Sequence, residues 1–469
     1  MKKQKKLKKQ VNKQKNKSKK IKVGLEIHGY LLTREKLFCR CKAEHGLKKV
    51  SPNVNICPIC TGQPGAKPML PNSEAIKKIL QISLMLGCKI NNKFLWQRKH
   101  YDWPDLPKGY QTTISGSYSV PVGENGNFLG IRIREVHLEE DPAKWDPENG
   151  CVDYNRSGMP LVEIVTEPDF SSSEQVSIWL KQLLLTLSYI KALDKDSGIK
   201  ADVNVSLYGD RIEIKNVNSI SSIVSAINYE SVRQKKEKPT KKETRAWLAD
   251  KQETVKMREK ESAEDYRFIP EPDLPIMKIQ DKEILELKKS IPESPTEKLD
   301  KLIKKHKIPE KSADVLVSNI ELVEFFEKVI EKIPADFALD WITIELLRVL
   351  NYNKTTLDKV DIKPEHFSEL LELVRKRKIT ELKAKQILNR FVPRSFSPLK
   401  EAEKSAKIVN QTELSLLIDK ILEKNTKAIQ DYKSGQSSAL NFLMGEVMKA
   451  SNRRADFQIA LEILKQKLK

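Results

Sequence analysis

The stretch VGLEIHGYLL, from Val23 to Leu32, predicts a β-strand with two unlike faces. Branched apolar residues occupy every second position from Val23 to Ile27, which is the period of a half-buried strand. The intervening positions place Glu26 and His28 together on the other face. A carboxylate and an imidazole side by side on such a strand require an ion partner or a ligand.

The charge of the chain indicates a polyanionic partner. The formal net charge is +21 over 469 residues, a length that suggests two to four domains. Residues 2–20 hold 11 lysines and no acidic residue, and subtracting these 11 charges leaves +10 for the rest of the chain. An excess of this size favours binding to nucleic acid or another polyanion.

The lysine-rich segment 1–21 is expected to be a disordered tail, because it has almost nothing to bury. It either contacts RNA phosphates or acts as a solubilising extension. No run of 18 apolar residues occurs, and no apolar segment follows the basic N-terminus. We therefore expect neither a transmembrane helix nor a secretory signal, and a cytoplasmic location.

The pattern of apolar residues changes near residue 286. Before this point, short alternating runs surround two helical segments, 73–86 and 174–190, which favours an α+β domain with a largely antiparallel sheet. After the linker Pro292–Pro295 the pattern becomes helical, with a second break at 391–400. We therefore expect three folded parts: an α+β domain at 22–285, a helical domain at 286–396 and a helical tail domain at 397–469.

Four of the six cysteines form two close pairs between residues 39 and 60. This spacing favours a tetrahedral Zn²⁺ site with four thiolates, closed and therefore structural. The alternative is a group of reduced, buried cysteines. We expect Cys88 and Cys151 to pack as small apolar side chains. The predicted zinc ligands are Cys39, Cys41, Cys57 and Cys60.

Carboxylates far along the chain are candidate partners for the first strand. They lie in HLEED (137–141) and within the apolar run of PLVEIVTEPD (160–169), where a carboxylate is costly unless it is paired or binds metal. Several carboxylates with one imidazole form a hard ligand set that suits Mg²⁺ or Mn²⁺. The alternative is a set of ion pairs with Arg132 and Arg134. The candidate metal ligands are therefore Glu26, His28, Glu163 and the acidic residues of HLEED.

Two further segments carry polar side chains in unusual settings. The alternation in segment 201–219 predicts a hairpin with one apolar face. The polar side chains of its other face indicate that it lines a cavity rather than a solvated surface. The loop 97–115 mixes cations with aromatic residues, which suits phosphate or nucleic-acid contact, although an ordinary surface loop is the alternative. No P-loop, Rossmann, HExxH or GxSxG motif is present.

Together these segments resemble the GatB family, the B subunit of tRNA-dependent amidotransferases. The motifs occur in the family's order from about residue 22 to the C-terminus, so the resemblance covers all of the chain except the lysine-rich segment 1–21. It rests on long motifs: VGLEIH, KLFCRC, CPICTGQPGAKPMLPN, RKHYDWPDLPKGYQ, HLEEDPAK, DYNRSGMPLVEIVTEPD, ADVNVSL, EIKNVNS, KKETRAW, MREKESAEDYRFIPEPDLP and DYKSGQSSALNFLMGEVMKAS.

The resemblance implies a cradle-like catalytic domain, a helical domain and a YqeY-like tail that binds tRNA. It implies a carbon–nitrogen ligase with glutamine as amido donor, working as a heterotrimer with the amidase GatA and the small partner protein GatC. This chain would use ATP and Mg²⁺ to phosphorylate the side-chain carboxylate of Glu-tRNA(Gln) or Asp-tRNA(Asn). Ammonia from the amidase would then convert these to Gln-tRNA(Gln) or Asn-tRNA(Asn).

The resemblance also implies roles for single residues. A lysine–carboxylate gate for ammonia would be formed by Lys108 and Glu140. Mg²⁺ would be held by Glu26, His28, Glu140 and Glu163, with Glu139 a weaker candidate. The remaining catalytic residues would be Lys99, Asp202, Asn204, Lys215 and Asn216. The nucleotide would be bound by Arg98, Arg156 and Glu213, and the tRNA by Lys433, Lys449, Arg453 and Arg454.

The sequence departs from the family pattern at His100, Asp102 and Trp103, where the usual motif reads RKNYFYPDLPKGYQ, and this leaves details of the aminoacyl pocket open. A related protein, GatE, carries an extra domain for which 469 residues leave no room. Two other readings stay open: a non-catalytic, zinc-containing tRNA-binding protein, and a metal-dependent hydrolase.

Overall fold

The computed structural model describes residues 21–45, 50–194, 198–207, 209, 211–239, 241–259, 266–399, 401, 411–451 and 455–468. The side chains of Asn216, Arg258, Glu259, Gln411, Glu413 and Ser437 lie outside that description. The chain divides into two compact units between Ser294 and Pro295, within the predicted linker. Each unit is described by itself.

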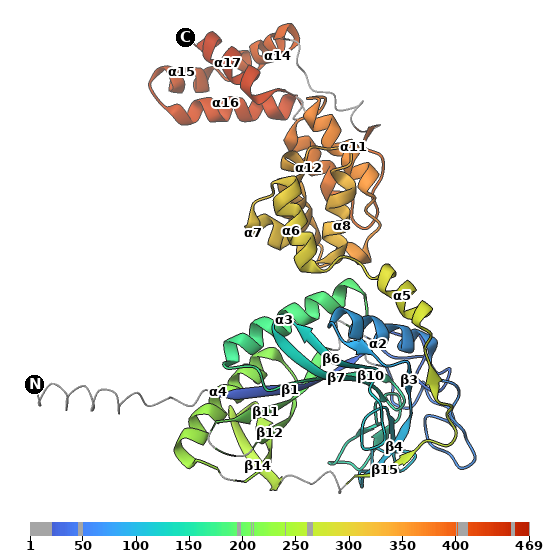
Figure 1. Cartoon of the computed structure of the whole chain (residues 1–469). Coiled ribbons are helices and arrows are strands. Elements are labelled where there is room, and N and C mark those ends of the chain that lie inside the picture. The colour runs from blue at the N-terminus through green and yellow to red at the C-terminus, as the bar shows by residue number, and fades with distance from the viewer. Residues whose placement is uncertain are drawn as a thin grey trace, which may run out of the picture. The chain divides into compact units, whose positions relative to one another are not determined.

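The first unit is built on a 12-stranded sheet with β1 (Lys22–Tyr30) near its centre (Figure 1). All pairings in it are antiparallel except that of β12 with β13, which confirms the predicted largely antiparallel sheet. The order along the sheet is β14 (Glu253–Glu259), β13 (Glu243–Leu248), β12 (Ile212–Val217), β11 (Ile199–Ser206), β1, β10 (Pro160–Thr166), β7 (Ile131–Glu140), β5 (Gln111–Thr113), β4 (Gln97–His100) and β15 (Arg267–Pro270). Off this path, β6 (Gly123–Phe128) pairs with β7 and with β2 (Lys89–Ile90).

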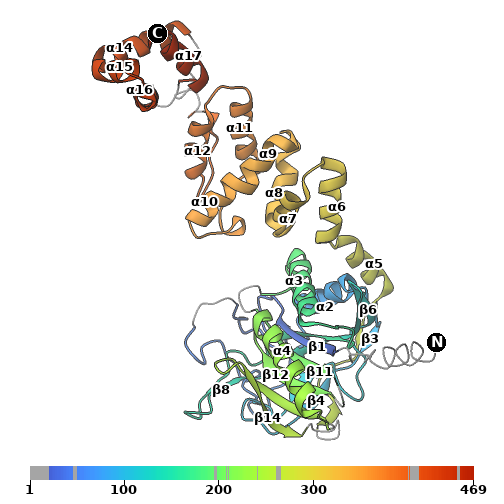
Figure 2. The same cartoon turned by 90° about the vertical axis from the view of Figure 1, so that its left-hand side faces the viewer.

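Three helices cover the apolar face of this sheet: α2 (Ser73–Met85), α3 (Ser173–Tyr189) and α4 (Ile220–Glu237) (Figures 1 and 2). Val23, Leu25 and Ile27 of β1 are buried in one core with residues from all three helices. Each helix begins after a residue whose side-chain oxygen accepts from the first turn, namely Asn72, Ser172 and Ser219. The strand therefore anchors in the core by its apolar face, as its alternation predicted.

Small elements complete the first unit. They are the two-stranded pairs β3 (Lys93–Phe94) with β16 (Met277–Lys278) and β8 (Lys144–Trp145) with β9 (Val152–Asp153), and the helix α5 (Asp281–Ser290).

The secondary-structure elements named in the described residues of the second unit are all helices. Its elements are α6 (Pro295–His306), α7 (Glu310–Val317), α8 (Ile320–Val329), α9 (Ala335–Asp340), a π-helical turn (Trp341–Leu346), α10 (Leu347–Tyr352), a 3₁₀ turn (Leu357–Lys359), α11 (Pro364–Arg375), α12 (Glu381–Asn389), α14 (Gln411–Lys424), α15 (Thr426–Lys433), α16 (Ser437–Ala450) and α17 (Phe457–Leu468). The last four share a core around Leu414, Ile418 and Leu443. The boundaries at 286 and 397 remain predictions. In the described part of the chain, no helix is both long and apolar enough to cross a bilayer.

Candidate active site

The polar face of the sheet gathers the charged residues of five neighbouring strands. Strand register sets His28 of β1 opposite Glu163 of β10, and Glu26 opposite Asp202 of β11. Because residues paired across strands point to the same face, these side chains form a row across the sheet. The opposite face of β1 is the apolar one, so the alternation separates core from site.

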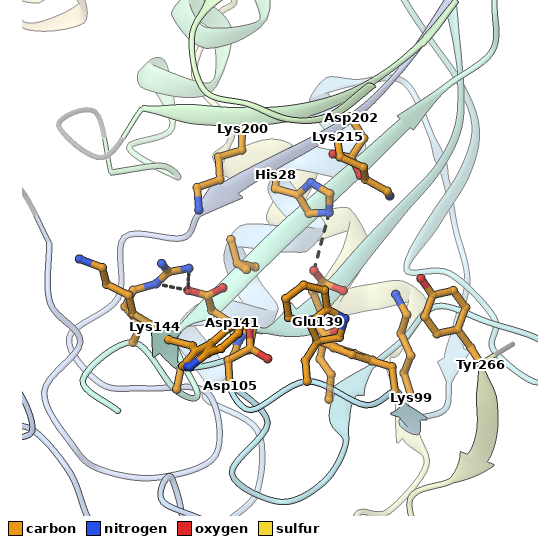
Figure 3. Close-up of a pocket in the computed structure, with 18 of the residues that line it drawn as sticks. His28, Lys99, Asp105, Glu139, Asp141, Lys144, Lys200, Asp202, Lys215 and Tyr266 are labelled. Atoms are coloured by element: carbon orange, nitrogen blue, oxygen red, sulfur yellow. Dashed lines mark hydrogen bonds and ion pairs between the residues drawn. The ribbon is translucent and has the colours of Figure 1, made fainter. Parts of the chain in front are cut away.

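The middle of this row is a three-residue donor set, His28, Glu139 and Glu163. The imidazole Nε2 lies 3.8 Å from a carboxylate oxygen of Glu139 and 3.9 Å from one of Glu163. Figure 3 shows the side chain of His28 pointing toward that of Glu139, with a dashed line marking the contact between them. One donor atom from each residue lies within 4.8 Å of the others, an arrangement that fits a single cation. Two carboxylates with one imidazole suit a hard divalent metal.

The charges in this set shift one another's pKa values. Burial, together with the charge of Glu163, raises the pKa of Glu139. Burial alone would lower the pKa of His28, but Glu163 and the other carboxylates around it outweigh this and raise it. The site therefore carries an excess of negative charge, which a bound cation would relieve.

A second donor set lies beside the first and contains Glu26, Asp202 and Glu213, with oxygens within 4.8 Å of one another. Lys215 bridges two of them, with its Nζ 2.6 Å from Asp202 and 2.9 Å from Glu213. Asn204 donates from Nδ2 to Glu26 at 3.0 Å. Burial, followed by the charges of Glu163 and Asp202, raises the pKa of Glu26. The hairpin 201–219 therefore lines a charged cavity wall, as its varied polar face predicted.

Glu140 lies apart from both sets. It follows Glu139 in β7 and so points to the opposite face. There its carboxylate accepts from the Lys108 ammonium and, at 2.9 Å, from the backbone N–H of Thr112. Lys108 also lies over Tyr110, 5.0 Å from the ring centroid. The structure thus joins the predicted lysine–carboxylate pair but does not bring Glu140 to His28 and Glu163.

The predicted nucleotide-binding arginines occupy different places. Arg98 lies on the same side of the sheet as Glu140. Its Nη2 lies 2.7 Å from a carboxylate oxygen of Glu271, and its guanidinium carbon lies 4.5 Å from the ring centroid of Tyr110. Arg156 lines the cavity and binds Asp141 at 2.7 Å. The Tyr30 hydroxyl donates to the same Asp141 at 2.6 Å.

A cavity of about 970 Å³ lies on the polar face, and the residues just described that line it are His28, Tyr30, Glu139, Asp141, Arg156, Asp202 and Lys215. Lys99 lines it, with its ammonium 4.8 Å from the ring centroid of Tyr266 and with no ion pair among the described residues. Lys200 also lines it, and burial lowers the pKa of that lysine, reinforced by the nearby charge of Arg156. Cations thus line the wall around the acidic sets, an arrangement suited to phosphate groups.

Sequence reasoning did not single out several residues of this cavity, among them Tyr30, Trp145 and Tyr266. Tyr30 had a usable signal, because it lies two positions after His28 on the same face of β1. The positions of Trp145 and Tyr266 depend on how distant loops fold back onto the sheet, which the local pattern does not encode.

The alternative in which Arg132 and Arg134 neutralise Glu163 does not hold in this structure. Arg132 pairs with Asp169 at 2.7 Å and Arg134 with Glu167 at 2.9 Å. Glu163 instead faces His28 and Glu139.

The four predicted zinc ligands come together. The Sγ atoms of Cys39, Cys41, Cys57 and Cys60 lie within 4.8 Å of one another, a spacing that fits one tetrahedral metal ion. The hydrogen bond from Cys39 lowers the pKa of the Cys60 thiol to about 5, and Lys36, 3.5 Å away, adds to this shift. Cys88 is buried as expected, whereas Cys151 is exposed, so the expectation that it packs as an apolar side chain was wrong. Its turn after Asn149 holds it at the surface.

The predicted tRNA contacts are only partly visible. Lys433 in α15 and Lys449 in α16 are both exposed, and Lys449 lies 3.9 Å from Glu446. Arg453 and Arg454 lie outside the described residues, as does the side chain of Asn216.

Comparison with known proteins agrees with this architecture. The family model described as the GatB/GatE catalytic domain matches residues 21–285, and the one described as the GatB domain matches residues 324–468. Two curated relatives, from Methanopyrus kandleri and Methanothermobacter thermautotrophicus, are each named as the B subunit of an aspartyl/glutamyl-tRNA(Asn/Gln) amidotransferase. They are 42% and 43% identical to this chain, and the alignments cover 96% of this chain in both cases and 98% and 100% of those proteins. The chain therefore belongs to the GatB family, the B subunits of the tRNA-dependent amidotransferases.

Proposed function

We propose that the cavity phosphorylates the side-chain carboxylate of a misacylated tRNA, Glu-tRNA(Gln) or Asp-tRNA(Asn), with ATP. The observation that carries this proposal is the set His28, Glu139 and Glu163, whose first two members line a cavity together with Lys99 and Lys215. Phosphoryl transfer needs charge neutralisation and alignment rather than a protein nucleophile.

The donor set fits Mg²⁺, which would be held by His28, Glu139 and Glu163 and would neutralise phosphate charge when bound. Glu26, Asp202 and Glu213 form a second candidate set. A carboxylate oxygen of the aminoacyl group attacks the γ-phosphorus of ATP, and the bond to the bridging oxygen breaks, releasing ADP. Lys99 can follow the phosphoryl oxygens, because no carboxylate among the described residues holds it in an ion pair. Lys215 is fixed by Asp202 and Glu213 and orients that wall of the cavity.

The second step converts the acyl phosphate to an amide. Ammonia attacks the carbonyl carbon, the carbon–oxygen bond to phosphate breaks, and the nitrogen loses a proton. Lys108 and Glu140 are proposed as the gate through which ammonia arrives, because this charged pair lies on the face of β7 opposite Glu139. Such a pair excludes bulk water and can exchange protons with ammonia.

The partners follow from the same proposal. Ammonia would come from glutamine in an amidase, GatA, within a cytoplasmic heterotrimer that includes GatC. The Cys₄ site would hold a structural Zn²⁺. The helical tail would bind the tRNA through exposed lysines such as Lys433 and Lys449.

A reconstituted heterotrimer tests the proposal. With labelled ATP and charged tRNA, we expect charged-tRNA-dependent transfer of the γ-phosphate, lost in Glu163→Gln while tRNA binding is retained. If Glu163→Gln leaves transfer unchanged, the reading as a non-catalytic tRNA-binding protein gains support. If the isolated chain hydrolyses phosphoesters without charged tRNA, the interpretation as a metal-dependent hydrolase gains support.

A further inference from the structure

Lys36 is a buried lysine beside the cysteine cluster. Its side chain is 1% exposed, and its ammonium donates to Cys60 Sγ at 3.5 Å and to the backbone oxygen of Tyr154 at 3.1 Å. Among the described residues no carboxylate forms an ion pair with it. Lysine is almost never fully buried without an opposite charge, because removing an unpaired ammonium from water is costly. The thiolates of the cluster are the groups that can supply this charge.

The cluster has charge to offer when it holds a metal. Four thiolates carry more negative charge than one divalent cation neutralises. Cys60 Sγ accepts from the Lys36 ammonium and, at 3.2 Å, from the backbone N–H of Cys57. Donors that bond to the ligands of a metal orient these ligands, and removing such a donor changes metal affinity about 10–100-fold. Lys36 is therefore placed to hold Cys60 in a ligating position.

The other partner of Lys36 belongs to the loop that carries Arg156. This loop, residues 154–159, runs between β9 and β10 and is called the Arg156 loop below. Tyr154, which accepts from Lys36, lies two residues before Arg156. Arg156 lines the cavity and pairs there with Asp141. One buried ammonium thus bonds both a candidate metal ligand and the backbone of a loop of the active site.

Further hydrogen bonds join the cysteine segment to the Arg156 loop. The Ser157 hydroxyl donates to the backbone oxygen of Cys60 at 2.6 Å. Asn155 Oδ1 accepts from the backbone N–H groups of residues 54 and 55, both at 3.0 Å, between the two cysteine pairs. Ser157 and Asn155 are themselves buried. The conformation of the Arg156 loop therefore depends on the cysteine segment as well as on the sheet.

We propose that Lys36 is a positioning residue that couples the cysteine metal centre to the active-site cavity. Cys60 is fixed when the cluster holds its metal, Lys36 joins Cys60 to Tyr154, and the loop then presents Arg156 to the cavity. The inference rests on the proposed function for what the cavity does. It goes beyond a purely structural zinc site, because metal occupancy then controls the placement of an active-site cation.

The first test measures the zinc affinity of the purified full chain by competition with a chelator. Lys36→Met removes the ammonium and keeps a long side chain in the buried space. We expect it to weaken zinc binding about tenfold or more. Lys42→Met is the matched control, because Lys42 is exposed although it directly follows Cys41, and its zinc affinity should stay within about twofold of the wild type.

The second test measures hydrogen exchange in the Arg156 loop, which depends on no reaction. The Gly158 N–H donates to the backbone oxygen of Asp141 at 2.9 Å, so its exchange reports whether the loop is in place. Removing zinc from the wild type, and Lys36→Met at saturating zinc, should each speed this exchange about tenfold or more. Lys42→Met should not. The Leu25 N–H, bonded to Thr166 within the sheet, should keep its rate and so exclude general unfolding.

Ser157→Ala is a second variant that remains informative if Lys36→Met does not fold. It removes one link between the Arg156 loop and Cys60 and keeps Lys36 and all four cysteines. We expect exchange of the Gly158 amide to rise about threefold, with zinc affinity within about twofold of the wild type. Unchanged exchange in this variant would count against the coupling.

The reconstituted heterotrimer connects the loop to the reaction. Lys36→Met and Arg156→Lys should each raise the KM for ATP about tenfold. The double variant should be little worse than the more impaired single variant, because both changes act through Arg156. Effects that multiply would contradict a shared route.

The inference is overturned if zinc removal leaves exchange of the Gly158 amide within twofold of the zinc-bound chain. It is equally overturned if Lys36→Met leaves both zinc affinity and this exchange within twofold of the wild type. A wild-type complex without charged-tRNA-dependent transfer would instead contradict the proposed function, and the zinc and exchange measurements would still decide whether Lys36 couples the two sites.

Discussion

Glu139 and Glu140 are consecutive in β7, and their carboxylates lie on opposite faces of the sheet. Glu139 faces His28 at 3.8 Å in the cavity, while Glu140 accepts from Lys108 on the other side. One peptide unit of the strand thus separates the proposed phosphoryl-transfer site from the proposed ammonia gate. This relationship gives two predictions that distinguish the two steps.

Glu139→Gln should abolish most of the phosphoryl transfer. The variant replaces a negative donor of the His28 set by a neutral one, which weakens Mg²⁺ binding. We expect transfer from labelled ATP to fall about 100-fold or more at physiological Mg²⁺. Raising the Mg²⁺ concentration should recover part of the loss, and a rate that ignores Mg²⁺ would contradict the assignment.

Glu140→Gln should give the opposite result. The glutamine oxygen can still accept from the Thr112 N–H, so the strand geometry is kept. We expect phosphoryl transfer within about threefold of the wild type, while glutamine-dependent amide formation falls about 100-fold. Equal losses in both assays would show that Glu140 acts in the first step instead.

A buried ion network behind the cavity should dominate the stability of the β13–β14 edge of the sheet. Glu230 of α4 is fully buried (0% exposed) and holds Arg233 at 2.9 Å and Arg245 at 3.3 Å. Glu230→Gln leaves those guanidinium groups undercompensated, so the free energy of unfolding should fall by about 3–5 kcal/mol. Urea unfolding of the full chain measures this.

The same network provides its own control. Glu237 also pairs with Arg233, at 2.7 Å, but its side chain is 55% exposed. Glu237→Gln should therefore cost less than about 1 kcal/mol. Similar losses in the two variants would mean that burial does not set the strength of these pairs.

How much the sequence could predict depends on whether a feature is local. The alternation in Val23–Ile27 and the hairpin at 201–219 encode their faces directly, and both were predicted correctly. The helix α4 was missed because polar residues, Glu230, Arg233 and Gln234, occupy the second half of its buried stripe. The sheet order was also out of reach, since it places β1 between β10 and β11, two strands that lie far along the chain from it.

The candidate site shows the same limit at the level of single residues. Residue type brought His28 and Glu163 into one hypothesis, the family resemblance added Asp202, and the structure places all three in one row. The choice between Glu139 and Glu140 depends on the register of β7 against β10, which pairs Glu139 with Leu161. A one-residue shift exchanges the two faces, so no composition argument could decide it.

The cysteine cluster should bind one zinc ion per chain and stabilise the first unit. Cys57→Ser removes one of four thiolates, so the zinc content should fall below about half an equivalent and the melting temperature should drop by several degrees. Cys151→Ser is the matched control, because Cys151 is exposed and outside the cluster. Metal analysis of the purified chain decides between zinc and free thiols. A wild-type chain without zinc would favour the reading as reduced cysteines.

The exposed lysines of the tail should bind tRNA phosphates without taking part in catalysis. Lys433→Gln with Lys449→Gln should weaken tRNA binding several-fold and reduce the slope of log affinity against log salt by about 1 for each lysine. At saturating tRNA the phosphoryl-transfer rate should stay within about twofold of the wild type. Lys282→Gln is the matched control: Lys282 is exposed on α5 and lies 3.9 Å from Glu286, as Lys449 does from Glu446. An unchanged salt slope in the double variant would place the tRNA contact elsewhere, and a fall in the saturated rate would mean that the tail also positions the charged 3′ end.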